Sequence, residues 1–136
     1  GTELTQNTLR ISDFELEDES SYEFNIGCRL AEKLMRLDAP PTAIFCINDM
    51  MAIGAIRALQ NWGVRVPQDV SVLGFDNMTI SKMITPALTT IDQCTREIGV
   101  RAIELLQKSF ENPSAPLETV RFKPKLVERE SVARRG

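Results

Sequence analysis

The chain has 136 residues, of which 43% are hydrophobic and 26% charged, a composition typical of a single globular domain. It contains no histidine, which excludes Ser-His-Asp catalysis, Cys-His catalysis and a His-based zinc site within this chain. The net charge of −3 provides no basic surface for nucleic acid, and no apolar run approaches the length that spans a bilayer.

The first predicted helix covers residues 20–37, because acidic and hydroxyl residues precede an apolar face that repeats every three or four residues. Pro40 and Pro41 end it, since proline cannot continue a helix. Residues 43–47 (AIFCI) then form a continuous apolar run, which predicts a short strand buried on both faces.

A second predicted helix begins after Asn48 and Asp49, which can cap it, and ends before Gly63. Residues 70–75 form the next predicted strand. A strand, a helix and a strand joined by short connections predict a βαβ unit whose two strands run parallel.

The second half of the chain continues this alternation. Residues 88–91 predict a third strand, residues 97–110 an amphipathic helix, and residues 120–122 and 126–128 two final strands. The predicted fold class is therefore α/β, with a mostly parallel sheet flanked by helices.

Three cysteines, Cys28, Cys46 and Cys94, lie far apart and form no C-x-x-C motif. This odd, unclustered set argues against a disulfide framework and favours a reducing compartment. Each has apolar neighbours, so we expect buried thiols, with a reactive thiol as the less favoured alternative. The first ten residues contain no apolar signal core, and we expect a cytoplasmic protein.

Polar pairs follow two of the predicted strands: Asn48-Asp49 after the first and Asp76-Asn77 after the second. Ligands of open α/β sheets bind beyond the carboxyl ends of the strands, where both pairs are expected. Carboxylates and carboxamides suit a polyhydroxylated ligand such as a sugar or a nucleoside. The alternative, which the pattern alone favours, is that each pair only caps a helix.

A catalytic use of Asp49 and Asp76 as general acid and base predicts a small α/β hydrolase. This hypothesis is weak, because no nucleophile accompanies the two carboxylates, and we expect no enzymatic activity, metal or cofactor. Phe75 and Phe14 are candidates for stacking on the apolar side of a sugar ring, although both residues also suit a core position.

Three motifs together resemble the C-terminal half of the effector domain of LacI/GalR-type transcriptional regulators. They are F-x-x-N-D-x-M-A-x-G-A from Phe45, G-x-x-V-P-x-D-V-S-V-x-G-F-D from Gly63, and P-x-L-T-T-I from Pro86, and the ending LVERESVA is similar as well. The resemblance covers approximately residues 13–133.

The resemblance implies the C-terminal lobe of a type I periplasmic-binding-protein-like fold. Residues 1–136 would be a partial effector-binding and dimerisation domain without the DNA-binding head, and residues 93–112 would belong to the other lobe. The motifs place Asn48, Asp76 and Gln93 at effector-contacting positions, and Phe14 resembles an aromatic residue that stacks on the ligand. The effector would be a sugar or a purine-like molecule.

The implied partners are that effector, a second copy of the chain, and operator DNA, reached only through the N-terminal domain. The implied dimer contact uses an exposed apolar patch after the N-D and G-F-D motifs, formed by Ile53, Ile56, Ile80, Met83 and Ile84. The sequence therefore predicts part of a cytoplasmic repressor that does not bind membranes. The alternative with the same fold is the sugar-binding protein of a transporter.

Overall fold

The computed structural model describes residues 22–114, 116 and 118–134. Three α-helices, a short 3-10 helix and four strands alternate along this part of the chain. In order, they are α1 (Glu23–Met35), β1 (Ala43–Phe45), α2 (Asp49–Asn61), β2 (Ser71–Phe75), η2 (Thr79–Lys82), β3 (Thr89–Asp92), α3 (Thr95–Glu111) and β4 (Lys125–Val127).

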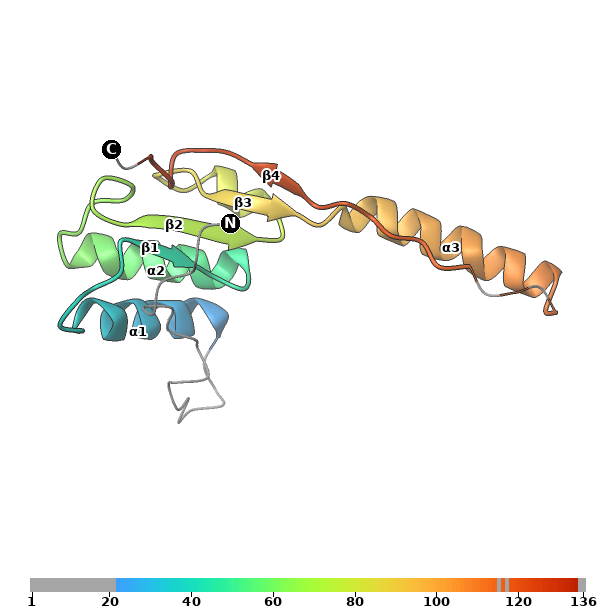
Figure 1. The fold of residues 1–136 in the computed structure, drawn as a ribbon, viewed down its shortest axis with the longest axis horizontal. Helices are drawn as coiled ribbons and strands as arrows, with labels where there is room; N and C mark the ends of the chain where they lie inside the picture. The colour runs from blue at the N-terminus through green and yellow to red at the C-terminus, as the bar shows by residue number, and fades with distance from the viewer. Residues whose placement is uncertain (1–21, 115, 117, 135–136) are drawn as a thin grey trace, which may run out of the picture.

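The strands form one sheet in the order β1-β2-β3-β4, in which β1, β2 and β3 run parallel and β4 runs antiparallel to β3. This confirms the predicted α/β class, the mostly parallel sheet and the βαβ unit. Only one of the two predicted final strands forms. Residues 120–122 have no strand structure, because they run beside α3 rather than beside the sheet (Figure 1).

The first strand differs from its prediction. The sequence predicted residues 43–47 to be buried on both faces, whereas β1 stops at Phe45 and is mostly exposed. Phe45 is 57% exposed and Ile47 is 62% exposed. The prediction was wrong because β1 lies at the edge of the described sheet and packs against helices on one face only.

The core lies between the sheet and α2, and α1 packs against the other side of α2 (Figure 1). The two helices approach each other closely at two glycines. A β-carbon on Gly27 would lie 2.0 Å from the carbonyl oxygen of Met51, and one on Gly54 would lie 2.0 Å from that of Phe24. The Cys28 thiol of α1 donates to the Gly54 carbonyl oxygen of α2 at 3.1 Å, so this side chain is part of the contact between the two helices.

The last helix projects away from the sheet (Figure 1). None of the residues of α3 is buried, and its exposed apolar side chains include Ile98, Ile103, Leu106 and Phe110. The chain returns beside α3, where Glu118 forms ion pairs with Arg101 and Lys108. Among the described residues, no helix has the length and apolar character needed to cross a membrane.

Candidate functional site

The carboxyl ends of the parallel strands place the predicted polar residues at one edge of the sheet. Phe45 of β1 pairs with Leu73 of β2, and Asn48 and Asp76 each follow three residues later. Asn48 also caps α2, because its Oδ1 accepts a hydrogen bond from the Met51 amide at 2.9 Å. The capping interpretation is therefore correct for Asn48, and it is compatible with a position at the rim of a site.

Asp76 and Gln93 contact each other directly. The Gln93 Nε2 donates to Asp76 Oδ1 at 2.6 Å, which joins the end of β2 to the residue that follows β3. Both side chains are partly exposed. Partial burial and the negative charges of Asp49 and Glu23 raise the pKa of Asp76, while the Gln93 hydrogen bond opposes that rise.

The backbone at this edge is unusual. Asp76 has φ 120°, Asn77 has φ 56° and Cys94 has φ 61°, all in the region that residues other than glycine rarely adopt. Such conformations persist only where surrounding contacts impose them, and they are concentrated at functional sites. At Cys94 this contact is a side chain, because its amide donates to Asp92 Oδ1 at 2.7 Å.

A network behind Asp76 was missed by sequence reasoning. The Asn77 Nδ2 donates to Asp92 Oδ2 at 3.1 Å, and Arg129 Nη2 donates to Asn77 Oδ1 at 2.6 Å. The hydrogen bonds to the Cys94 amide and to Asn77 lower the pKa of Asp92. Arg129 lies in the R-E-S ending that carries the resemblance, but no local pattern links it to Asn77, 52 positions earlier.

Asp49 has a different position from the one the acid–base hypothesis required. Its side chain is fully buried, and its oxygens accept hydrogen bonds from the Met78 amide at 2.7 Å and from the Ser81 and Thr90 hydroxyls at 2.5 Å each. Gly74 makes room for it, since a β-carbon there would lie 2.3 Å from Asp49 Oδ1. A carboxylate occupied in this way holds three segments together and has no access to a substrate.

The two aromatic candidates have different outcomes. Phe75 is the last residue of β2, is partly buried, and pairs in register with Ile91. The alternating burial of β2 places Phe75 on the face opposite the buried Val72 and Gly74. Its stacking role stays a prediction. Phe14 lies outside the described residues.

A cavity of about 640 Å³ lies elsewhere, on the sheet and the C-terminal segment. Apolar and charged side chains line it, and neither Asn48, Asp76 nor Gln93 is among them. The lining residues include Phe45, Leu73, Thr89, Leu126, Arg129 and Val132. The described residues contain no cluster of acidic or sulfur ligands that could hold a metal ion.

The profile of the periplasmic binding protein-like domain matches residues 4–132. The chain belongs to this family. A solved member with similar coordinates is a LacI family transcriptional regulator from Enterococcus faecium with bound ribose, with a TM-score of 0.76 and 31% identity. The match covers 83% of this chain and 41% of that one.

Two curated relatives of this periplasmic binding protein-like chain are repressors. The HTH-type transcriptional repressor PurR of Mannheimia succiniciproducens is 44% identical over 114 residues, which cover 84% of this chain and 34% of that protein. The ribose operon repressor of Haemophilus influenzae is 37% identical, with the same coverage of both chains. The chain thus spans about a third of the length of the curated relatives it matches.

The expected dimer patch of this periplasmic binding protein-like chain is only partly exposed. Ile53 and Ile56 are 8% and 2% exposed, because they pack into the core from α2, so the expectation that they form an exposed patch was wrong. Ile84 also packs against the core. Ile80 and Met83 are exposed, by 40% and 70%, so the part of the expected patch that is exposed lies in η2 and the residue after it.

Proposed function

We propose that this chain forms one wall of the effector-binding cleft of a LacI-type transcriptional repressor, and that the effector is a sugar. The observation that carries the proposal is the Asp76–Gln93 pair at the carboxyl edge of the parallel sheet. Two curated relatives named as repressors and the related regulator with bound ribose support it. Operator DNA would be contacted by a separate segment, and the repressor would act in the cytoplasm.

The chemistry of the pair suits a sugar. The Asp76 carboxylate accepts hydrogen bonds from hydroxyl groups, whereas the Gln93 carboxamide both donates and accepts. In the free chain each side chain orients the other at 2.6 Å, so the donors and acceptors that a ligand would engage already lie together. A site built to hydrogen-bond hydroxyl groups discriminates strongly against ligands that lack them.

The test is a titration of the chain with D-ribose followed in amide NMR spectra. We expect shifts concentrated at Asn48, Asp76 and Gln93, with an affinity on the order of millimolar because a single wall buries only part of the ligand. Asp76→Ala should abolish these shifts, and Asp38→Ala, at an exposed position, should retain them. Equal shifts with L-ribose, or shifts away from this edge, would contradict the proposal.

The projecting helix supports the division into lobes. We propose that residues 93–112 belong to the second lobe of the repressor, which would cover the apolar side chains of α3. Their exposure supports this: Ile103 is 60%, Leu106 58% and Phe110 81% exposed. A helix with an apolar face is normally covered by another element.

We also propose that the repressor dimerises through the exposed apolar residues around η2, which are Met78, Ile80 and Met83. Sedimentation velocity at micromolar concentration should show a dimer that Met83→Asp converts to a monomer. Leu106→Asp on α3 is the matched control and should leave the dimer intact. A monomeric starting chain, or a dimer that only Leu106→Asp dissociates, would contradict this contact.

A further inference from the structure

Two side-chain hydrogen bonds cross between the ends of β2 and β3. Asp76 accepts from Gln93, and the next residue, Asn77, donates to Asp92, the residue before Gln93. The backbone adds a third link, since the Asp76 amide donates to the Ile91 carbonyl oxygen at 2.9 Å. The Asp76–Gln93 bond is the one that a ligand binding to either side chain would replace, whereas the Asn77–Asp92 bond can stay in place.

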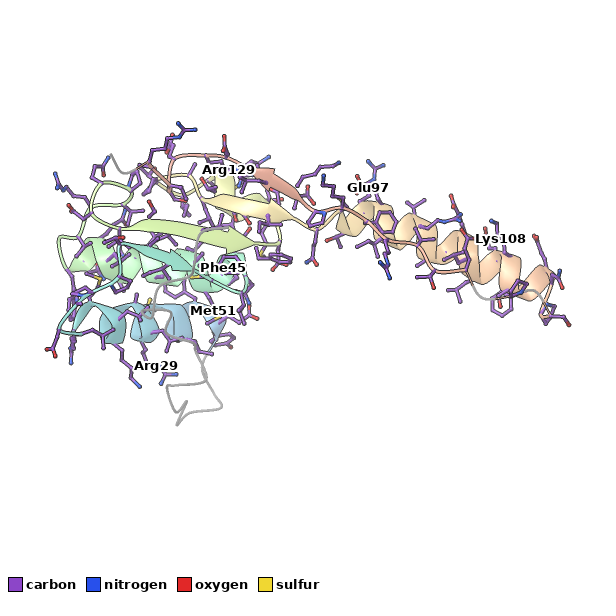
Figure 2. The ribbon with its side chains drawn as sticks, in the orientation of Figure 1. Arg29, Phe45, Met51, Glu97, Lys108 and Arg129 are labelled. Atoms are coloured by element: carbon purple, nitrogen blue, oxygen red, sulfur yellow. The ribbon has the colours of Figure 1, made fainter. Side chains whose placement is uncertain are left out.

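Arg129 holds the second of these bonds from the side of the C-terminal segment. Its Nη2 donates to Asn77 Oδ1 and its Nη1 donates to the Leu88 carbonyl oxygen, both at 2.6 Å. Its own amide donates to Thr89 Oγ1 at 2.9 Å. Figure 2 shows Arg129 beside the sheet, on the segment that follows β4. One guanidinium therefore ties Leu88, the residue before β3, to Asn77, the residue beside Asp76.

The Asn77 carboxamide is used at both ends, which fixes its orientation. Its oxygen accepts from Arg129 and its nitrogen donates to Asp92, so the chain of contacts runs from Arg129 through Asn77 to Asp92 and the Cys94 amide. Asn77, which follows Asp76, and Cys94, which follows Gln93, both have positive φ. Without side-chain contacts such a backbone relaxes toward commoner conformations.

We propose that Arg129 is a positioning residue of the effector site, which holds Asp76 and Gln93 in place through Asn77 and Asp92 when the effector replaces their mutual hydrogen bond. The inference rests on the proposed function and deepens it. In this proposal Arg129 acts without contacting the effector, since Nη1 and Nη2 donate to the Leu88 carbonyl oxygen and to Asn77 Oδ1. Its effect is preorganisation of the site, which increases affinity by lowering the ordering cost of binding.

We call the chain of contacts from Arg129 through Asn77 and Asp92 to the Cys94 amide the relay. Cysteine alkylation tests it without any ligand. Cys94, at the end of the relay, and Cys46, in the core, are 5% and 6% exposed, so iodoacetamide reacts with each only after an opening. Peptide mass spectrometry reads the two rates separately. We expect Arg129→Met and, independently, Asn77→Asp to increase the Cys94 rate about tenfold and to leave the Cys46 rate within about twofold, because only local opening changes.

Asn77→Asp is informative because its oxygens still accept from Arg129, whereas it can no longer donate to Asp92 and sets two carboxylates side by side. Arg129→Lys is the conservative rescue, because an ammonium can reach one acceptor. Its Cys94 rate should fall between that of the starting chain and that of Arg129→Met. Arg65→Met, which removes an exposed ion pair with Asp69, is the matched control and should change neither rate.

The outcomes separate the relay from the proposed function. If both cysteines accelerate equally in Arg129→Met and Asn77→Asp, Arg129 only stabilises the fold and the inference is wrong. The inference also fails if Cys94 is unaffected in both variants. In the D-ribose titration, Arg129→Met should weaken binding about tenfold, and unchanged affinity would overturn the positioning role. A starting chain that shows no ribose shifts overturns the proposed sugar effector, while the alkylation rates still decide the relay.

Discussion

Asp49 and Asp76 stand at the ends of neighbouring strands, yet their surroundings give them different roles. Asp49 is fully buried and receives three hydrogen bonds from the segments after β2 and from β3. Asp76 is partly exposed and shares one of its oxygens with Gln93. A buried carboxylate is tolerated only when its hydrogen bonds are made, so Asp49 organises the edge on which Asp76 is presented.

Removing the Asp49 carboxylate should strongly destabilise the fold. Asp49→Ala leaves the Met78 amide and two buried hydroxyls without their acceptor, and we expect a loss of at least about 3 kcal/mol in the free energy of unfolding. Asp49→Asn retains an acceptor and should cost less. Urea denaturation measures both, with the exposed Asp38→Ala as a control expected within about 0.5 kcal/mol of the starting chain.

The pKa of Asp76 should exceed that of Asp92 in a carboxyl-carbon NMR titration, because their surroundings shift the two values in opposite directions. Gln93→Leu should raise the pKa of Asp76 further, since it removes a donor to the ionised form. Because the folded value is raised, ionised Asp76 destabilises the fold above that pKa, and this cost is relieved as the pH falls through it. An Asp76 value below that of Asp92 would refute this assignment.

At the level of elements, the contact between α1 and α2 depends on two glycines, which have no side chain. Gly27 and Gly54 let each helix approach a carbonyl oxygen of the other. Met51 of α2, labelled in Figure 2, is the residue whose carbonyl oxygen faces Gly27. The close approach packs α1 onto α2. Nine of the thirteen residues of α2 are buried, between α1 and the sheet. Ile53 and Ile56 belong to this buried set, so they lie in the core and not on a dimer surface.

Gly27→Ala should separate the two helices, because the new methyl group would lie 2.0 Å from a backbone oxygen that cannot rotate away. We expect a destabilisation of about 3 kcal/mol, measured by urea denaturation. The matched control is Gly99→Ala in α3, where a β-carbon meets no atom within 4 Å. That substitution should increase the helical circular dichroism signal slightly, because alanine favours a helix by about 1 kcal/mol over glycine.

At the level of the whole molecule, two parts differ in how they are held. The sheet with α1 and α2 has a common core, whereas the described residues of α3 and of the segment beside it form none of their own. Surface ion pairs from Arg101 and Lys108 to Glu118 join those two segments, and pairs of this kind each contribute little. The stability of the molecule is therefore concentrated at one end.

Hydrogen exchange should reveal this division. Backbone amides of α3 should exchange at least about a hundredfold faster than those of α2, since no α3 side chain is buried and local opening is inexpensive there. Exchange followed by mass spectrometry compares the peptides covering 95–111 and 49–61. Similar protection of both helices in a monomer would show that α3 is held more firmly than its exposure indicates.

Several features of the fold follow from the sequence because their causes are local. The prolines after α1, Gly63 after α2 and the strand-helix-strand spacing each act within a few residues, and they predicted the elements and the parallel pairing. The motif around Asn48 and Asp76 placed both residues at one edge of the sheet, because strands in a βαβ unit end on the same side. The resemblance to the regulators added Gln93.

Only the tertiary structure decided which apolar and polar residues face a neighbour. The continuous apolar run of residues 43–47 gave no sign that this strand is at an edge, and the pattern of α2 could not reveal that Ile53 and Ile56 are both buried. The buried acceptor Asp49 and the contact from Arg129 to Asn77 join residues 29 to 52 positions apart. Such pairings depend on how the whole chain packs, and no local propensity encodes them.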